Sequence, residues 1–248
     1  MSDPLLQVLY EDGRLLVVNK PPGLVCHPTR GDETSSLIGR VRLHLGSAEG
    51  RLVNRLDRET SGVVLIAKDG PTAGALGKLL ASAACHKEYW AIVHGHLTPD
   101  SQTIDAPLGR DDASAVAIRD RVRDDGAAAR TELVVRRRFD RDGRPFTLLA
   151  LRPSTGRKHQ LRIHLSHIGH PIVGDKIYGD DEQRYLRFVT RSLTEDDRRA
   201  LLTDHHLLHA RSLALAWAGR DWTFTAEPGD EMRRWIASTG LASLPNDD

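Results

Sequence analysis

Residues 55–62 read RLDRETSG and run directly into the apolar stretch VVLIA at residues 63–67. The octamer is the most concentrated polar stretch of the chain, and the apolar run after it has the length of a buried strand. Asp57 therefore lies between two arginines where a loop meets a strand, and nearby positive charge keeps a carboxylate ionised. Such a carboxylate is a candidate nucleophile or base. From these residues alone, the alternative is a structural salt bridge.

The chain before and just after the octamer predicts a hairpin, a tight corner and two helices. Asp12-Gly13 separates two apolar runs, and an Asp-Gly pair in that position is a strong hairpin signal. The corner is KPPG at residues 20–23. The expected strands are Leu5–Tyr10 and Arg14–Asn19, and apolar residues at helical spacing predict helices over Ser36–Leu45 and Pro71–Ala81.

Strands dominate the middle of the chain, and helices return near its end. A helix with Leu161 and Ile168 on one face follows Arg157, with Thr155 as its expected N-cap. One further helix is expected to begin at Thr194, and another to cover Asp230–Ser238. The other expected strands are Glu88–Val93, Ala115–Val122, Thr131–Arg137, Phe146–Leu151, Leu207–Trp217 and Trp222–Ala226. Because no repeat or long linker divides residues 1–248, we expect one mixed α+β domain with mostly antiparallel pairing.

Composition excludes several classes of protein. The 248 residues are 40% hydrophobic and 28% charged, which suits a globular chain and not a disordered, collagen-like or coiled-coil one. No apolar run approaches the ~20 residues of a membrane helix, and the first residues do not resemble a secretory signal, so we expect a cytoplasmic protein. Cys26 and Cys85 show no CxxC spacing, and we expect both thiols to be reduced.

Basic residues are unevenly distributed along a nearly neutral chain. Arginine and lysine total 35, against 34 acidic residues. Residues 119–162 hold thirteen basic and six acidic residues, an excess of seven positive charges. This excess favours either a face that binds a phosphate backbone or a solvated strand face. The candidate phosphate contacts within it are Arg136, Arg137 and Arg138.

Common sequence signatures of nucleotide, hydrolase and metal chemistry are absent. Gly77-Lys78 lacks the other residues of a phosphate-binding loop, Ser61 lacks the first glycine of a nucleophile elbow, and no GxGxxG occurs. Two groups of histidines have spacings that metal ligands can have, but no HExxH pattern accompanies them, so we expect no bound metal. These groups are His164, His167 and His170, and His205, His206 and His209.

RLDRETSG resembles the defining motif of the RluA-type pseudouridine synthases, and further blocks similar to that family occur in the family's order. They are VNKPPGLVCHP (18–28), HKEYWAIVHG (86–95), GAAARTELVVRRRF (126–139), TGRKHQLRIHLSHIGHPIVGDKIYG (155–179) and LLHARSLAL (207–215). The resemblance extends over roughly residues 8–230. The resemblance implies a single pseudouridine-synthase-type α+β catalytic domain, with a mostly antiparallel mixed sheet flanked by helices and a central cleft.

The resemblance also implies roles for individual residues. Asp57 would be the catalytic carboxylate, Tyr89 would lie against the target uracil, and Arg162 would pair with Asp57 and keep it charged. Arg55 would enter the RNA stack, since a flipped-out base needs a stacking surface and leaves a gap to fill. The reaction is an isomerisation within one nucleotide, so no cofactor is implied. Attack of Asp57 on the sugar, attack on the ring and removal of a sugar proton all stay open.

Two positions depart from the family's usual pattern. Asn54 stands where a histidine commonly precedes Arg-Leu-Asp, which weakens any role of this position as a proton donor, and Ala127 replaces a frequent lysine. No separate basic RNA-binding domain precedes residue 10, so we expect a monomeric catalytic domain that binds structured ribosomal or transfer RNA by its own surface. The rival interpretation is a non-catalytic RNA-binding or RNA-chaperone protein that retains the fold. The sequence identifies neither the RNA nor the uridine.

Overall fold

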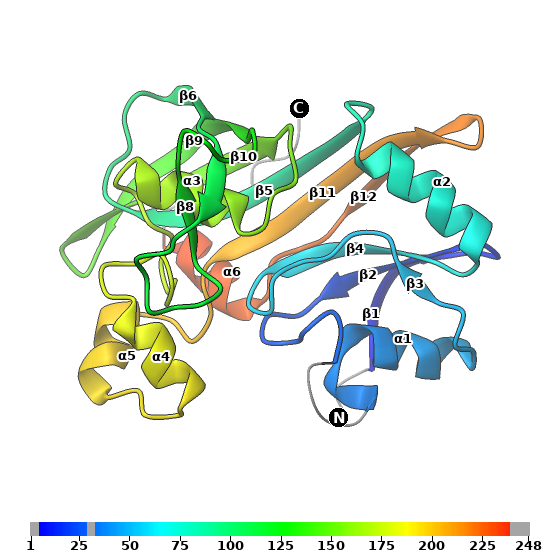
Figure 1. The fold of residues 1–248 in the computed structure, drawn as a ribbon, viewed down its shortest axis with the longest axis horizontal. Helices are drawn as coiled ribbons and strands as arrows, with labels where there is room; N and C mark the ends of the chain where they lie inside the picture. The colour runs from blue at the N-terminus through cyan, green and yellow to red at the C-terminus, as the bar shows by residue number, and fades with distance from the viewer. Residues whose placement is uncertain (1–4, 29–32, 239–248) are drawn as a thin grey trace. The chain divides into compact units, whose positions relative to one another are not determined.

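The computed structural model describes residues 5–28 and 33–238 (Figure 1). The chain divides into two compact units, Met1–Tyr89 with His209–Gly229, and Trp90–Leu208 with Asp230–Asp248. We call them unit 1 and unit 2. The single domain expected over residues 1–248 stays a prediction. Within the described residues, no helix is both long and apolar enough to cross a membrane.

Unit 1 is built on strands that converge on the octamer. The hairpin of β1 (Gln7–Glu11) and β2 (Leu15–Lys20) is antiparallel, as is the pairing of β2 with β4 (Ser61–Ala67). The short β3 (Arg51–Leu52) also pairs with β4. β11 (Leu208–Trp217) runs parallel to the start of β4 and forms a hairpin with β12 (Arg220–Thr225). The predicted hairpin around Asp12-Gly13 is confirmed.

Strands β2 and β4 are buried on both faces because a helix covers each face (Figure 1). Their odd-numbered residues, such as Val63, join one apolar cluster with Leu76 of α2 (Gly70–Leu80). Their even-numbered residues, such as Val64, join another with Val41 of α1 (Leu37–Leu45). Successive side chains of a strand point to opposite faces, so the unbroken apolar run after the octamer fits a strand between two helices.

Polar side chains fix where both helices of unit 1 begin. Ser36 Oγ accepts a hydrogen bond from the Gly39 amide at 3.2 Å, and Asp69 Oδ1 accepts one from the Thr72 amide at 2.7 Å. Side chains at the N-cap satisfy amides that have no partner within the helix. The helices predicted at Ser36–Leu45 and Pro71–Ala81 are therefore confirmed to within about a residue at each end, which is the usual uncertainty of helix boundaries.

Unit 2 holds a second set of antiparallel strands. β5 (Cys85–His94) begins in unit 1 and enters unit 2, where the strand order is β5-β10-β9-β6. The long hairpin of β9 (Arg130–Arg141) and β10 (Arg144–Pro153) is followed along the sheet by β6 (Ser101–Asp105). The remaining elements are β7 (Leu108–Arg110), β8 (Asp120–Val122), the 3₁₀ turn Glu33–Ser35 in unit 1, and helices α3 (Gln160–His167), α4 (Gln183–Val189), α5 (Glu195–Leu201) and α6 (Asp230–Ala237).

The described units confirm an α+β protein with mostly antiparallel pairing, but one strand prediction needs correction and one helix was not predicted. Only Asp120–Val122 of the predicted strand Ala115–Val122 is a strand. The residues before it form turns, in which the Arg119 amide donates to the Val116 carbonyl at 2.8 Å. Helix α4 has no counterpart among the predicted elements.

The predicted N-cap of α3 is also wrong. The helix begins at Gln160, and His159 occupies the N-cap with a left-handed φ of 55°. The Thr155 hydroxyl instead donates to Gln160 Oε1 at 2.8 Å and accepts from the Arg130 amide at 2.9 Å. Thr155 therefore ties the loop before α3 to strand β9, four residues ahead of the position where a cap could act.

Candidate active site

The loop that carries Asp57 joins β3 to β4 in unit 1 and is fixed where it leaves β3. The Val53 amide donates to the Leu65 carbonyl at 2.8 Å. The Asn54 side chain then continues the pairing, since its Nδ2 donates to the Val63 carbonyl at 3.1 Å and its Oδ1 accepts from the Leu65 amide at 2.8 Å. An amide supplies one donor and one acceptor group at once, which gives Asn54 a structural role.

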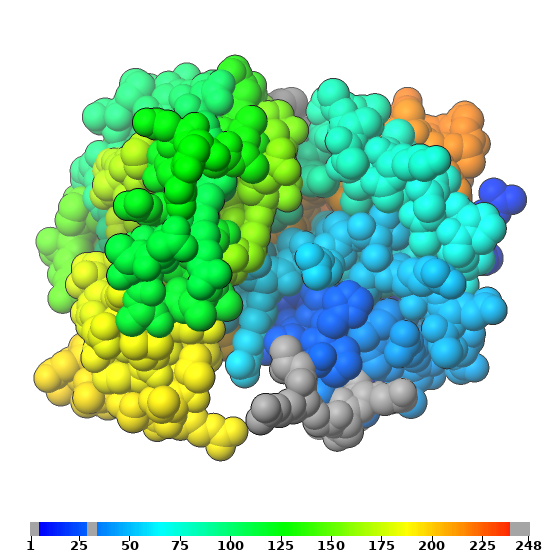
Figure 2. All heavy atoms as spheres, viewed as in Figure 1, coloured from blue at the N-terminus to red at the C-terminus, as the bar shows by residue number. Residues whose placement is uncertain are grey.

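The loop reaches the surface of unit 1 (Figure 2). Asp57 is half-buried, and the residues on either side of it, Leu56 and Arg58, are buried and exposed respectively. A turn follows Asp57, in which the Thr60 amide donates to the Asp57 carbonyl at 3.2 Å. A half-buried carboxylate on a short, tied loop is open to a ligand while its backbone is held in place.

The end of the octamer is anchored on β11. Ser61 Oγ is 2.8 Å from His209 Nδ1, and His209 Nε2 is 2.9 Å from the Ala226 carbonyl. Burial lowers the pKa of His209 to about 4, so its ring is neutral near pH 7, where it donates to Ala226 and accepts from Ser61. Gly62 follows with φ +116°, and a Cβ there would lie 2.2 Å from the Ala210 carbonyl oxygen. The motif therefore requires glycine at this position.

Lys20 is a second anchor that the sequence did not single out. Its side chain is fully buried, and Nζ donates to the carbonyls of Pro21 (2.9 Å), Leu24 (2.9 Å) and Arg58 (3.1 Å). Burial lowers the pKa of Lys20 to about 8, although the charges of Cys26, Asp57 and Glu59 act in the opposite direction. The KPPG corner, whose lysine this is, was the available signal in the sequence.

Tyr89 lies close enough to Asp57 for the two side chains to interact within unit 1. Tyr89 is half-buried on β5 and packs against the apolar cluster that contains Leu56. Burial raises the pKa of the Tyr89 phenol well above its usual value, and the negative charge of Asp57 raises it further. The phenol therefore stays protonated, so Tyr89 can offer a ring face and a hydrogen-bond donor but cannot act as a base at neutral pH.

Arg55 stands two residues before Asp57 and points its charge to the outside. It is exposed and forms no ion pair with any of the residues that the structure describes. A guanidinium that is not engaged by protein groups can stack on a base or bind phosphate without first breaking a salt bridge. This environment is compatible with the role predicted for Arg55.

Arg162 lies in unit 2, where its described partner is an acid that the sequence reasoning missed. It is buried on α3, and its guanidinium donates from Nε to Asp175 Oδ2 at 2.7 Å and from Nη2 to Asp175 Oδ1 at 2.9 Å. Burial alone would raise the pKa of Asp175, but the charge and hydrogen bonds of Arg162 hold it well below its usual range. The predicted pairing of Arg162 with Asp57 is not tested by these contacts and stays a prediction.

An aromatic ring fixes the other side of the Arg162 guanidinium. Its central carbon lies 5.0 Å from the centroid of the Tyr178 ring. The Tyr178 hydroxyl is 2.9 Å from His159 Nδ1 and accepts from the Asp120 amide at 3.2 Å. Arg162 is thus a buried cation with a fixed orientation, because both an acid and a ring position it.

The excess of seven positive charges in residues 119–162 is largely balanced by acids that lie outside that segment. Arg119, Arg130 and Arg138, for example, pair with Glu182, Asp105 and Asp100. Of the three predicted phosphate contacts, Arg138 also donates from Nε to the Leu97 carbonyl, Arg136 is half-buried at a bulge of β9, and Arg137 is exposed. Arg137 is therefore the strongest of the three candidates, and RNA binding by all three stays a prediction.

Three of the six histidines that raised the question of a metal, His164, His170 and His209, are hydrogen-bonded to oxygen atoms. His164 contacts Thr131 Oγ1 at 2.9 Å and the Ala106 carbonyl at 3.0 Å, and His170 contacts the His94 carbonyl at 2.8 Å. Within residues 5–28 and 33–238, no three histidine, cysteine or acidic side chains are grouped so that they could hold a metal ion.

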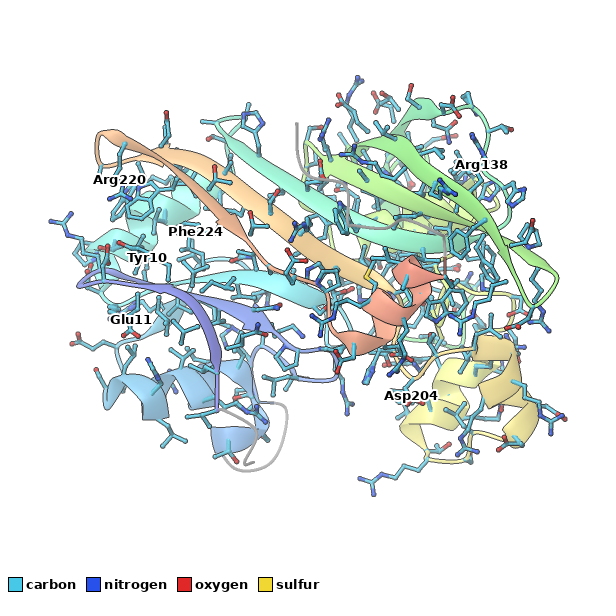
Figure 3. All side chains as sticks on the ribbon, turned by 180° about the vertical axis from the view of Figure 1, so that it is seen from behind. Tyr10, Glu11, Arg138, Asp204, Arg220 and Phe224 are labelled. Atoms are coloured by element: carbon cyan, nitrogen blue, oxygen red, sulfur yellow. The ribbon has the colours of Figure 1, made fainter. Side chains whose placement is uncertain are left out.

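Unit 1 also has a cavity of about 390 Å³ that none of the predicted site residues lines. It lies along β12 and the end of β1, where the Tyr10 ring is 5.7 Å from that of Phe224 and Arg220 stacks on Trp222 at 3.6 Å (Figure 3). Tyr10 donates to Asp12 Oδ2 at 2.8 Å, so its hydroxyl is occupied.

Known proteins resemble the chain in both sequence and structure. It is 37% identical over 187 residues to the uncharacterized RNA pseudouridine synthase YlyB of Bacillus subtilis, with 72% of this chain and 60% of that protein covered. It is 39% identical over 182 residues to ribosomal large subunit pseudouridine synthase D of Xanthomonas campestris, with 72% and 53% covered. The chain thus spans between half and two thirds of the length of these two relatives.

A third relative is covered more fully. The chain is 36% identical over 185 residues to the dual-specificity RNA pseudouridine synthase RluA of Vibrio parahaemolyticus, with 74% of this chain and 73% of that protein covered. The solved structure of human RNA pseudouridylate synthase domain containing 4 has a TM-score of 0.74 and 27% identity, and covers 97% of this chain and 95% of its own. Residues 14–167 match the family described as RNA pseudouridylate synthase, and the chain belongs to that family, in its RluA-type branch.

Proposed function

We propose that this protein is an isomerase that converts uridines of structured ribosomal or transfer RNA to pseudouridine through the carboxylate of Asp57. The observation that carries the proposal is the position of that carboxylate, which is half-buried on a loop tied to β4 and β11 and whose charge acts on the protonated phenol of Tyr89. The relatives named above, each called a pseudouridine synthase, support it. We expect a monomeric, cytoplasmic enzyme.

The chemistry needs nothing beyond the nucleotide and these side chains. The bond between N1 of uracil and C1′ of the ribose breaks, the ring turns, and a bond forms between C5 and C1′, while the hydrogen of C5 leaves as a proton and N1 gains one. Asp57 either attacks the sugar, attacks the ring or removes a sugar proton, and all three routes need an ionised carboxylate. In this proposal Arg162 supplies the cation that favours that ionised state.

Two other side chains handle the flipped nucleotide. A base that has left the stack needs an aromatic surface, and the ring of Tyr89 supplies it. The space left in the RNA needs a planar filler, and the exposed guanidinium of Arg55 is suited to it. Arg137 is the proposed contact with the phosphate backbone, and Arg136 and Arg138 flank it.

The test is a comparison of pseudouridine positions in total RNA from cells with and without this protein. A position that is lost without the protein, restored by the wild type and not restored by Asp57→Ala would support the proposal and identify the substrate. If Asp57→Ala restored the position as well as the wild type, the protein would act by binding RNA and not by catalysis. If no position changed, the proposed activity would be wrong for this organism's RNA.

A further inference from the structure

Lys20 is a fully buried charged side chain. Its exposed fraction is 0%, and it lies at the end of β2. An ammonium has three N–H donors, and each of the three described hydrogen bonds from Lys20 goes to a different backbone carbonyl. Burying a charge is costly unless its donors are satisfied, so the positions of the three carbonyls are tied to the presence of the charge.

The three carbonyls come from two different loops. Pro21 and Leu24 belong to the KPPG corner, while Arg58 is the residue after Asp57. A second bond joins the same loops, since Arg58 Nε donates to the Gly23 carbonyl at 3.1 Å. Lys20 therefore reaches across from the corner and holds the backbone directly beside the proposed catalytic carboxylate.

The titratable groups that act on Lys20 come from two segments, the chain just after the corner and the octamer. Cys26 lies after the corner, and Asp57 and Glu59 lie in the octamer. Burial raises the pKa of the Cys26 thiol, and that sulfur accepts from the Leu56 amide at 3.5 Å. Glu59 is itself buried. Negative charge on Cys26, Asp57 or Glu59 favours the ammonium form of Lys20.

We propose that Lys20 is a positioning residue for the pseudouridine synthase reaction, and that its ammonium fixes the loop of Asp57 by binding the Arg58 carbonyl together with the corner. A neutral amine has only two N–H donors and turns a lone pair toward one of the carbonyls, so the loop loosens when Lys20 loses its proton. The importance of this for catalysis rests on the proposed function, whereas the effect on the loop does not.

The loop can be followed without any RNA. The Thr60 amide, which donates to the Asp57 carbonyl, reports the turn, and the Leu65 amide, which donates to Asn54, reports the neighbouring strand. We would measure hydrogen exchange of both amides from pH 6.5 to 9.5, corrected for the intrinsic exchange rate, in the wild type, Lys20→Met and the exposed control Lys78→Met. We expect Lys20→Met to lower the protection of the Thr60 amide by about tenfold or more and to leave that of the Leu65 amide unchanged. In Lys78→Met we expect the protection of both amides to equal that of the wild type. Unchanged protection at Thr60 would overturn the proposal.

A second variant keeps the test valid if Lys20→Met does not fold. In the wild type we expect the protection of Thr60 to fall on the alkaline side with a midpoint near the Lys20 pKa of about 8. Glu59→Gln removes one of the charges that favour the ammonium, so it should move this midpoint to lower pH. A midpoint that is absent, or that Glu59→Gln leaves in place, would contradict the proposal.

The catalytic consequence is measured separately. Formation of the bond at C5 displaces the hydrogen there, so RNA labelled with tritium at C5 of its uridines reports turnover by releasing tritium to water. We expect the single-turnover rate to fall at alkaline pH with the same midpoint as the protection of the Thr60 amide. This should hold both in the wild type and in Glu59→Gln. No tritium release from any RNA would refute the proposed function. The hydrogen-exchange result would then decide by itself whether Lys20 fixes the loop of Asp57. If turnover occurs but the midpoint of its alkaline limb differs from that of Thr60 protection, the positioning role of Lys20 is refuted and the proposed function is not.

Discussion

The guanidinium of Arg162 and the carboxylate of Asp175 form a two-point pair inside unit 2, with N–O distances of 2.7 and 2.9 Å and almost no exposure of either side chain. Asp175 also accepts from the Ile177 and Tyr178 amides at 2.9 and 3.0 Å. The acid therefore holds the cation on α3 and the turn after it at the same time. Every oxygen of this carboxylate has a partner, which is the condition under which a buried charge is tolerated.

Removing the acid should destabilise the protein far more than removing an exposed one. We expect Asp175→Ala to lower the free energy of unfolding by about 3–5 kcal/mol, because it removes the carboxylate that makes a two-point pair with the buried Arg162 cation. The matched control is Asp100→Ala, whose carboxylate pairs with Arg138 at the surface; we expect a loss of about 0–1 kcal/mol there. Chemical denaturation at pH 7 measures both. Equal effects of the two substitutions would show that the buried pair has no special weight.

Gly62 should be intolerant of any side chain. Gly62→Ala places a Cβ 2.2 Å from the Ala210 carbonyl oxygen at a φ of +116°, so β4 and β11 would have to separate. We expect a loss of more than about 3 kcal/mol in the free energy of unfolding. Gly77→Ala, in the middle of α2 and with nothing near its Cβ, should instead stabilise by about 1 kcal/mol. Thermal unfolding of each variant measures both effects. A loss of less than about 1 kcal/mol in Gly62→Ala would mean that β4 and β11 can separate at little cost in free energy.

The buried ring of His209 should make stability depend on pH in the acid range. In the unfolded chain this group takes up a proton near its ordinary pKa of 6.5, whereas in the folded protein it does so only near 4. Its contribution is therefore complete above pH 6.5 and is lost as the pH falls toward 4, by up to about 1.4 kcal/mol per pH unit. Chemical denaturation between pH 7.5 and 4.5 measures this. The free energy of unfolding should fall less steeply with falling pH in His209→Gln than in the wild type. Identical slopes would mean that the folded protein accepts a charged His209.

RNA affinity should depend on Arg137 more than on Arg138, although they are neighbours on β9. Arg138 is occupied by Asp100 and the Leu97 carbonyl, while Arg137 is exposed and has no ion pair with a described residue. We expect Arg137→Ala to reduce the slope of log affinity against log salt by about one, and Arg138→Ala to change it less. Filter binding to total ribosomal RNA at several salt concentrations measures this. The opposite order would remove Arg137 as a phosphate contact.

Local pattern predicted most elements of the fold, and the failures occur where distant residues decide. The hairpin at Asp12-Gly13 and the buried strand after the octamer follow from turn chemistry and apolar runs, and the structure has both. The predicted strand at Ala115–Val122 begins with four apolar residues, but most of it forms turns in the structure. Pattern alone does not contain that information.

The site shows the same division. Asp57 and Tyr89 were identified by resemblance, and the structure brings them within interacting distance in unit 1. Asp175 is thirteen positions after Arg162 and Lys20 is thirty-eight before Arg58, and nothing in the sequence says that such residues meet. The sequence also does not show which acids balance the charge excess of residues 119–162, because several of them lie outside that segment.

Single-turnover tritium release from uridine-labelled ribosomal and transfer RNA, with the wild type and Asp57→Asn, tests most directly whether Asp57 carries the reaction. Asp221→Asn, on the exposed end of β12, is the matched control. Asparagine keeps the size of the side chain and removes its charge, so we expect Asp57→Asn to slow release by a factor on the order of 10³ or more. RNA affinity and the control rate should stay unchanged. Release by Asp57→Asn at the wild-type rate would contradict a catalytic role for this carboxylate.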